Sequence, residues 1–215
     1  MSLINKDISK CYACDQKSVS REHVPPHCFF PKGFRKDLLT VPSCKRHNQD
    51  NSINVEYVRD IITTCFQVNN IGFTQFENKT FKSVTRNNSL IHKLLNNSMP
   101  ALISGKETRA IEIDLNIFDI VFNLIGKALY YYDFKKRLVP KFKTYPVSFF
   151  FDQQANNEER NEYTKIIYSL NSLAYEEMKN DNPKVFKYYR YKDKDSIIYR
   201  TDFYEGFIVF LAYVK

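Results

Sequence analysis

The pattern of hydrophobic and polar positions along the chain predicts two clear helices. In residues 53–62 the apolar side chains recur at the spacing of an amphipathic helix, and Asn51 and Ser52 are candidate caps at its start. Residues 117–132 carry apolar side chains around nearly their whole circumference, and Asn116 is placed to cap this segment. A helix that is apolar on all sides is predicted to lie in the core.

Strands are predicted mainly in the second half of the chain, from the alternation of apolar and polar residues in 109–115 and from strand-like runs in the other segments. The expected strands are residues 109–115, 145–151, 184–191, 196–203 and 207–214. Residues 158–178 are predicted to form a further helix, and the mixed, polar pattern of residues 70–108 favours helix interrupted by loops. This order of elements predicts an α+β fold with an antiparallel sheet.

Composition separates the beginning of the chain from the rest. Residues 1–52 contain four of the five cysteines, three of the four histidines and four of the eight prolines. We therefore expect a small module over residues 1–68, followed by a mixed α+β domain over residues 69–215 whose role the sequence leaves open. A chain of 215 residues is long enough for both parts.

The chain is basic, with a formal net charge of +8 and a pI of about 9.1. An excess of cations favours polyanionic partners such as nucleic acid. No stretch approaches the roughly 18 apolar residues that a membrane span needs, and the first residues lack the apolar run of a signal peptide. We therefore expect a cytoplasmic protein without a membrane partner. In that reducing compartment, clustered cysteines indicate metal binding rather than disulfides.

Two short motifs in the first fifty residues have the spacing of zinc knuckles. Cys11 and Cys14 are separated by two residues, and so are Cys44 and His47. This spacing allows a tight turn to direct both side chains at one ion, and four such ligands complete a tetrahedral site for Zn²⁺. Because the protein fills all four positions, the predicted zinc is structural. Its binding would supply folding energy to a segment too polar to close a sufficient core.

Two cysteines remain outside these knuckles. Cys65 lies on the apolar face of the predicted helix and is expected in the core, whereas Cys28 is an alternative ligand in place of one knuckle residue. The competing interpretation of the knuckles themselves is that Cys11 and Cys14 are ordinary buried thiols. Two matched pairs within one fifty-residue segment favour the metal.

An acid–histidine pair lies between the knuckles. Glu22-His23 is followed by Pro25 and Pro26, and Asn48 comes directly after the second knuckle. In this combination the segment resembles the zinc-bound branch of the HNH endonuclease family over about residues 10–60. The resemblance implies a ββα-metal fold and a metal-dependent endonuclease that hydrolyses phosphodiester bonds, of DNA in preference to RNA. It also implies a catalytic Mg²⁺ or Mn²⁺ beside the structural zinc.

The predicted chemistry assigns one role to each of three residues. His23 suits a general base that deprotonates water, because its ordinary pKa is near 6.5. The resemblance implies that Glu22 and Asn48 ligate the catalytic ion, and their oxygens are ligands that Mg²⁺ accepts. Adjacent strand residues point to opposite faces, so a bend after His23, favoured by Pro25 and Pro26, would help both to reach one site.

The sequence departs from the commonest pattern of the family at three places. His47 stands where the fourth zinc ligand is usually Cys, and Glu22 stands where Asp is frequent. The middle Asn of the family, which supports the loop of the base, has no clear match, and Asp37 and Thr40 are the candidate substitutes. Asn51, three residues after Asn48, is a rival ligand for the catalytic ion.

Several cations surround the motif and are candidates for phosphate contacts, with a simple solvated surface as the alternative. We predict nucleic-acid contacts for Arg21, Lys45 and Arg46; Lys32, Arg35 and Lys36 belong to the same cluster. The rival function is a non-catalytic zinc module that binds nucleic acid or a protein partner, and a homo-oligomer is also open. A weaker alternative is a purely structural zinc fold. An HNH-like module followed by an α+β domain resembles bacterial HNH endonucleases, which by association belong to restriction or phage-defence systems.

Overall fold

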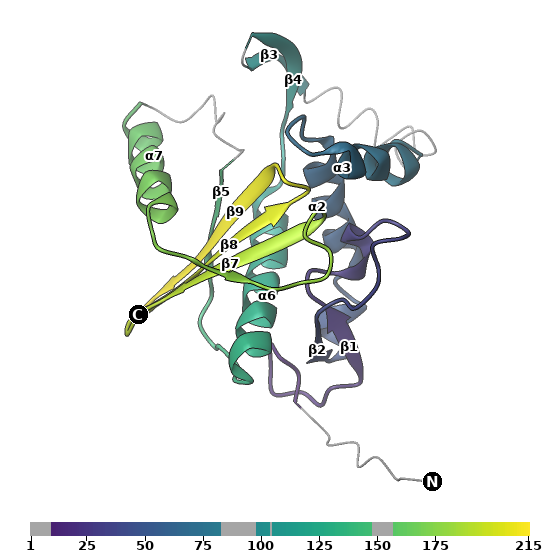
Figure 1. Cartoon of the computed structure of the whole chain (residues 1–215), viewed down its shortest axis with the longest axis vertical. Helices are drawn as coiled ribbons and strands as arrows, with labels where there is room; N and C mark the ends of the chain where they lie inside the picture. The colour runs from purple at the N-terminus through teal and green to yellow at the C-terminus, as the bar shows by residue number, and fades with distance from the viewer. Residues whose placement is uncertain (1–9, 83–97, 104, 148–156) are drawn as a thin grey trace.

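A computed structural model describes residues 10–82, 98–103, 105–147 and 157–215. Within these residues the fold is mixed α+β with antiparallel strands, as the sequence predicts (Figure 1). None of the helices in the described part of the chain combines the length and the apolar character that crossing a bilayer requires.

A ββα unit forms the beginning of the described chain (Figure 1). Its elements are β1 (Ser20–His23), η1 (His27–Phe29), β2 (Thr40–Ser43), α1 (Lys45–Asn48) and α2 (Ser52–Thr64). The two strands pair antiparallel, with His23 opposite Thr40. The helix predicted over residues 53–62 is confirmed, and its apolar face buries Val58 and Ile62. Asn51 precedes this helix, but its side chain makes no capping hydrogen bond there.

The last part of the chain forms a five-stranded antiparallel sheet in the order β5-β9-β8-β7-β6. Its strands are β5 (Lys143–Pro146), β6 (Glu176–Met178), β7 (Phe186–Lys192), β8 (Ser196–Phe203) and β9 (Phe207–Val214). Apolar and polar residues alternate along β8, so that Tyr199 and Phe203 face one side while Ile198 faces the other. The predictions for β8 and β9 agree with the structure at both ends.

Helix α6 (Leu115–Phe134) joins the ββα unit to the sheet (Figure 1). It contacts α2 and β2 on one side and β5 and β9 on the other. Because both sides are covered, its buried residues lie around most of its circumference, as predicted for a core helix. The predicted cap is wrong: the Asp114 carboxylate, not Asn116, accepts hydrogen bonds from the first backbone N–H groups of the helix.

One apolar core runs from the ββα unit through α6 to the sheet. The ring of Phe203 in the sheet lies 5.4 Å from that of Phe29 and 5.8 Å from that of Phe122, between centroids. The hydroxyl of Tyr204 donates a hydrogen bond to the backbone oxygen of Phe29. A second, smaller cluster on the opposite face of the sheet packs Leu170 of α7 (Asn157–Asn171) against Phe210.

The remaining elements differ from the predictions in places. Residues 70–108 contain α3 (Asn70–Gln75), a π-helical turn η2 (Phe76–Phe81) and the first strand of a hairpin, β3 (Ser98–Ile103) with β4 (Lys106–Ile111). The strand predicted over 109–115 ends at Ile111, because Asp114 already caps α6.

Two further predictions need correction or fall partly outside the described residues. The helix predicted over 158–178 ends at Asn171, because residues 176–178 instead pair with β7 as the edge strand β6. The strand predicted over 145–151 corresponds to β5, and residues 148–151 lie outside the described part of the chain.

Candidate metal centre and adjacent cleft

The four predicted knuckle residues come together at one point. One ligand atom from each of Cys11, Cys14, Cys44 and His47 lies within 4.8 Å of the others. The Sγ atoms of Cys14 and Cys44 are 3.8 Å apart, and His47 Nδ1 is 3.5 Å from Cys11 Sγ and 3.4 Å from Cys44 Sγ. A tetrahedral ion with Zn–S bonds of about 2.3 Å requires about 3.8 Å between sulfurs and about 3.5 Å between sulfur and nitrogen. The cluster therefore has the dimensions of a metal site.

Local backbone structure places both knuckles. The first lies in a turn closed by the bridge between Lys10 and Lys17, and the backbone N–H of Tyr12 donates to Pro42 of β2 at 2.9 Å. In the second, Cys44 directly follows β2 and is the N-cap residue of α1, so that one helical turn brings His47 back beside it.

The electrostatics of the cluster suit metal ligands. Burial pushes the pKa of the Cys11 thiol upward, but backbone N–H groups including that of Ala13 outweigh it, and the net shift is downward. Burial and then the cations Arg46 and Lys127 lower the pKa of His47, which keeps its ring neutral and able to coordinate.

The two remaining cysteines lie outside the cluster. Cys28 is not one of the grouped ligands, so the metal set is the one predicted from the knuckles. Burial raises the pKa of both Cys28 and Cys65 to about 12, and Cys65 packs against the core as predicted. Neither thiol is therefore activated as a nucleophile. Burial also raises the pKa of Cys14 in the cluster, to about 11, so the position of the ligand atoms and not the pKa separates the metal set from the other cysteines.

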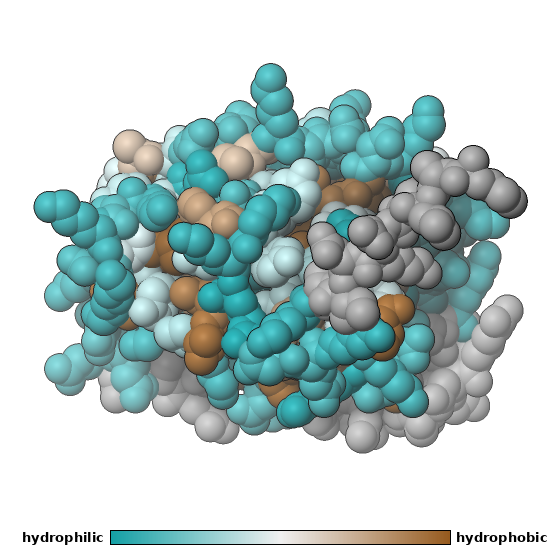
Figure 2. All heavy atoms as spheres, turned by 90° about the horizontal axis from the view of Figure 1, so that it is seen from below, coloured by the Kyte–Doolittle hydropathy of each residue, from teal (hydrophilic) through white to brown (hydrophobic). Residues whose placement is uncertain are grey.

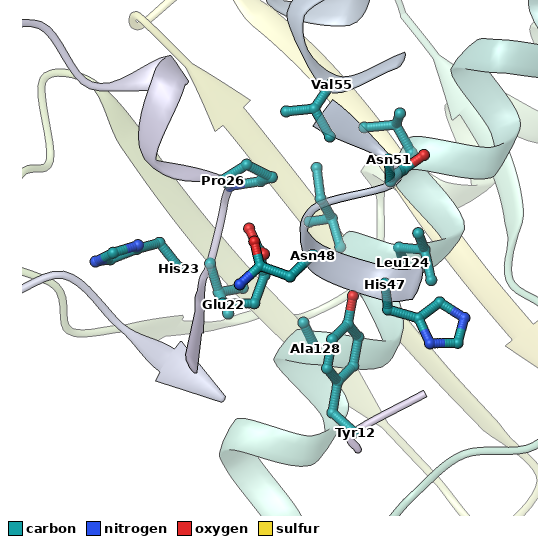
Figure 3. Close-up of a pocket in the computed structure, with 13 residues that line it drawn as sticks. Tyr12, Glu22, His23, Pro26, His47, Asn48, Asn51, Val55, Leu124 and Ala128 are labelled. Carbon is teal, nitrogen blue, oxygen red and sulfur yellow. The ribbon is translucent and has the colours of Figure 1, made fainter. Parts of the chain in front are cut away.

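A cleft lies directly beside the metal cluster (Figure 3). It has an empty volume of about 330 Å³, part of it open to solvent. All three residues predicted to carry chemistry line it, namely Glu22, His23 and Asn48, and His47 connects it to the metal cluster. Its far wall is apolar and comes from α6, through Val121, Leu124, Ile125 and Ala128. The cleft is therefore built jointly by the ββα unit and a helix distant in sequence.

Glu22 carries the clearest sign of an unmet interaction in this cleft. Its Oε2 atom is buried and has no hydrogen-bond partner among the residues that the structure describes. Burial raises the pKa of the Glu22 carboxyl to about 7. A buried carboxylate without a partner is unfavourable unless a cation or a donor compensates it. The side chain is thus available to a positively charged ligand.

The two candidate amide ligands, Asn48 and Asn51, differ in the hydrogen bonds that their side-chain oxygens accept. The Asn48 side-chain NH₂ donates to Ser20 Oγ at 2.9 Å and to the Arg21 backbone oxygen at 3.4 Å. These bonds fix the amide against β1, and no described residue donates to the Asn48 Oδ1. The Oδ1 of the rival Asn51 instead accepts a hydrogen bond from Asn54 at 3.0 Å. The geometry favours Asn48 over Asn51 as a ligand.

His23 projects away from Glu22 and Asn48, as Figure 3 shows. This is the orientation expected for neighbours on a strand, since Glu22 and His23 are consecutive residues of β1. The His23 ring makes no hydrogen bond to a described residue and lies 5.1 Å from the ring of His27, between centroids. Burial and then the His27 charge lower the pKa of His23, so that its ring is neutral at pH 7 and can accept a proton.

The predicted supporting and substrate-contacting residues are placed as follows. Thr40 lies opposite His23, but its hydroxyl accepts a hydrogen bond from Arg21 Nε at 2.8 Å. Asp37 lines a different pocket, next to residues 180–182. Neither residue takes the place of the middle Asn. Lys45 and Arg46 are exposed on α1, at the surface beside the metal cluster.

Sequence reasoning missed two kinds of cleft residue. Tyr12, inside the first knuckle, is fully buried and lines the cleft, although its position between two ligands could have indicated a place near the metal. The α6 wall gave no such signal, because nothing local in an apolar helix specifies which site it covers.

Comparisons with protein-family models, with curated proteins and with solved structures found no match to this chain. The fold and the site thus define a mixed α+β protein with a Cys₃His cluster suited to a metal ion, beside a cleft that has one polar side and one apolar wall.

Proposed function

We propose that this protein is a metal-dependent endonuclease of HNH type that hydrolyses phosphodiester bonds of nucleic acid, with DNA favoured over RNA. The observation that carries the proposal is the cleft: Glu22, His23 and Asn48 line it together, beside the metal cluster. The setting that we propose is cytoplasmic, in restriction or phage defence.

In this proposal the Cys₃His cluster holds Zn²⁺ in a structural role. The ligand distances support zinc, because they fit a tetrahedral ion bound by thiolates and one imidazole. All four positions belong to the protein, which leaves none for substrate. The ion would fix β2 and α1 relative to the turn that carries Cys11, and so would shape the adjacent cleft.

Glu22 and Asn48 would hold the catalytic Mg²⁺ or Mn²⁺. The partnerless Oε2 of Glu22 and the Oδ1 of Asn48 are hard oxygen ligands of the kind these ions take from proteins. Such an ion, when bound, stabilises negative charge on the phosphate and on the leaving oxygen. It would also compensate the buried charge of Glu22.

His23 would accept the proton of the attacking water. Displacement at phosphorus proceeds in line, so the base and the group that stabilises the leaving oxygen act from opposite sides. His23 lines the same cleft as Glu22 and Asn48, although its ring projects to the opposite face of β1 from Glu22. The lowered pKa of His23 keeps the ring in the accepting form at neutral pH.

Plasmid cleavage tests the proposal. Protein that contains its zinc but no other divalent ion is incubated with supercoiled plasmid, with or without Mg²⁺ or Mn²⁺. We expect nicking that requires the added ion and falls by about 10²- to 10⁴-fold in His23→Ala, the usual range for loss of a general base. The proposed nuclease function would be rejected if the wild-type, zinc-loaded protein left both plasmid and single-stranded substrates intact in the presence of the added ion.

A matched pair of glutamate variants separates ion binding from general charge effects. Glu22→Gln keeps the shape of the side chain and removes its charge, whereas Glu56→Gln makes the same change on the exposed side of α2. We expect Glu22→Gln to raise the Mg²⁺ concentration needed for half-maximal cleavage, and Glu56→Gln to leave it unchanged. Equal behaviour of the two variants would remove Glu22 from the ion site.

One observation favours the alternative of a non-catalytic zinc module that binds nucleic acid or a protein partner. The His23 ring points away from Glu22 and Asn48 and contacts His27 (Figure 3). If His23 serves only this ring contact, His23→Ala will lower stability without changing any activity on nucleic acid. The plasmid assay together with a thermal melt distinguishes the two functions.

A further inference from the structure

The loop that follows α6 concentrates positive charge beside the metal-binding unit. Five cations fall within nine residues, Lys135, Lys136, Arg137, Lys141 and Lys143, and no acidic residue occurs between 134 and 147. We call residues 135–143 the basic loop. Its four lysines are exposed, and none of them forms a salt bridge with a described residue. The charge is therefore available to an external partner.

The basic loop is firmly anchored although most of it has no regular secondary structure. Two of its apolar residues, Leu138 and Phe142, are buried, whereas Val139 is exposed. The Phe142 ring packs so closely on α6 that a side chain at Gly126 would collide with it. Asn123 accepts the backbone N–H of Phe142 at 3.1 Å, and Lys127 donates to the Val139 backbone oxygen at 3.0 Å. These contacts hold the backbone of the loop, which lowers the entropy lost on binding. Lys135 Nζ also donates to the Tyr132 backbone oxygen at 2.8 Å, so this lysine is held against the end of α6.

An ion pair ties the basic loop to the metal-binding unit. Arg137 Nη1 lies 2.8 Å from Asp15 Oδ1, directly after the first knuckle. Cations also lie close together at Lys127 of α6. Burial lowers the pKa of Lys127, and the nearby charges of Lys141 and Arg137 lower it further. The charge of Lys127 in turn contributes to the lowered pKa of His47. Positive charge therefore continues from the loop to the ligand that borders the cleft. Figure 2 views this end of the molecule, and hydrophilic side chains dominate it.

The dimensions suit the backbone of a nucleic acid. Ala128 lines the cleft, and Lys135 follows it on the same helix seven residues later, roughly 10 Å along the axis. Phosphates recur about every 3.4 Å along each strand of a DNA duplex. The loop would thus meet phosphates about three nucleotides from the one in the cleft.

From this arrangement we infer that the basic loop is a phosphate-backbone contact surface, through which the sheet region holds duplex DNA against the cleft of the ββα unit. The inference rests on the proposed nuclease function for the identity of the partner, and it gives residues 135–143 a role that no motif indicates. Contacts of this kind fix the position of the duplex and carry no sequence information.

Salt-dependent binding of two matched quadruple variants tests this surface. One variant replaces Lys135, Lys136, Lys141 and Lys143 by Gln; the control replaces four exposed lysines elsewhere, Lys165, Lys179, Lys184 and Lys194. Both lose the same charge, and both carry His23→Ala to prevent cleavage. Binding of a short labelled duplex is followed by fluorescence anisotropy at NaCl concentrations between about 50 and 200 mM. Thermal melts and zinc content confirm that each variant is folded.

We expect the loop variant to bind at least about tenfold more weakly at low salt and to lose about 0.9 of the slope of log Kd against log [NaCl] for each lysine that contacts a phosphate. The control variant should keep nearly the full slope. Equal weakening of both variants, no binding by the wild type, or displacement of the duplex by polyglutamate as readily as by unlabelled DNA would overturn the inference.

Hydrolysis of bis(p-nitrophenyl) phosphate by the zinc-loaded wild type with Mg²⁺ or Mn²⁺ separates this inference from the proposed function. This small diester can be hydrolysed in the cleft but is too short to contact the basic loop at the same time. If the diester is cleaved and the loop variant binds duplex DNA normally, the proposed role of the basic loop is rejected, while the proposed nuclease function is supported. If the diester stays intact while binding depends on the loop, the nuclease fails and the surface is retained as a nucleic-acid contact.

Discussion

The ββα unit and the five-stranded sheet differ in what holds them together. β1 and β2 have four residues each, and the turn before β1 is fixed through metal-binding side chains. β8 and β9 have eight residues each and bury aromatic and aliphatic side chains on both faces of the sheet. We expect the first region to depend on its metal as well as on the shared core, whereas the second depends on apolar burial alone. A ligand-dependent region can leave polar groups such as Glu22 uncompensated near a cleft.

The largest expected effect comes from removing one metal ligand. Coordination of structural zinc stabilises small domains by about 10 kcal/mol or more at neutral pH, which is comparable to the whole net stability of a domain. Cys44→Ser should therefore bind no stoichiometric zinc and should lose hydrogen-exchange protection across β1, β2 and α1. Protection in β7 to β9 should persist, because no strand of the sheet supplies a ligand.

The control for this prediction is Cys28→Ser, which makes the same change at a thiol outside the cluster. Metal content by mass spectrometry and exchange by peptide-resolved mass spectrometry give the two readouts. A Cys44→Ser protein that keeps one zinc and an unchanged exchange pattern would contradict a ligand-dependent unit.

The same contrast explains which features the sequence could predict. The metal ligands follow from spacing alone, since one turn brings together residues separated by two positions, and Cys11 to His47 indeed converge. β8 and β9 follow from short runs rich in β-branched and aromatic residues, which are nearly continuous in β9 because both of its faces meet a core. Both patterns depend only on residues that are close together in the sequence.

The predictions from the sequence fail where contacts with residues distant in the chain determine the local structure. Glu176 to Met178 have a helical pattern, but the edge of β7 offers backbone hydrogen bonds and converts them to a strand. Asp114 and Asn116 are both good caps, and tertiary packing starts α6 at the first of them. The α6 wall of the cleft and the contact of Arg137 with Asp15 join segments that are far apart in the sequence, and no local pattern encodes them.

Truncation of Phe203 should break the connection between the two regions. This side chain is fully buried, and its ring contacts those of Phe29 in the ββα unit, Phe122 in α6 and Phe186 in the sheet. Phe203→Ala is expected to lower the free energy of unfolding by about 3–5 kcal/mol, from lost apolar burial and the cavity that remains. Urea denaturation followed by circular dichroism measures the loss.

The matched control is Phe66→Ala, which removes the same ring from an exposed position and should change stability by less than about 1 kcal/mol. Release of zinc, followed with a chromophoric chelator in the same titration, reports the ββα unit separately. If zinc release in Phe203→Ala occurs at a clearly higher urea concentration than the loss of sheet, the two regions unfold independently and the shared core does not couple them.

The smallest expected effect compares two carboxylates, one from each region. Asp202 in the sheet resembles Glu22 in that it carries a buried side-chain oxygen without a hydrogen-bond partner, but Asp202 does not line the cleft. Burial raises the pKa of Asp202 against the opposing effects of Arg200 and Lys187. Because its pKa in the folded state lies above that in the unfolded state, its ionisation destabilises the fold once the pH exceeds the ordinary value near 4.

Asp202→Asn should therefore raise the free energy of unfolding at pH 7, and the gain should disappear below about pH 4, where the carboxyl is protonated in both states. Asp50→Asn, at an exposed carboxylate of the ββα unit, serves as the control and should change little at either pH. Urea denaturation at both pH values gives the comparison. Nuclease activity should be unaffected by Asp202→Asn, in contrast to Glu22→Gln, because only the carboxylate of the ββα unit faces the cleft. A stabilisation that is equal at pH 3 and pH 7 would show that the charge of Asp202 is not its cause.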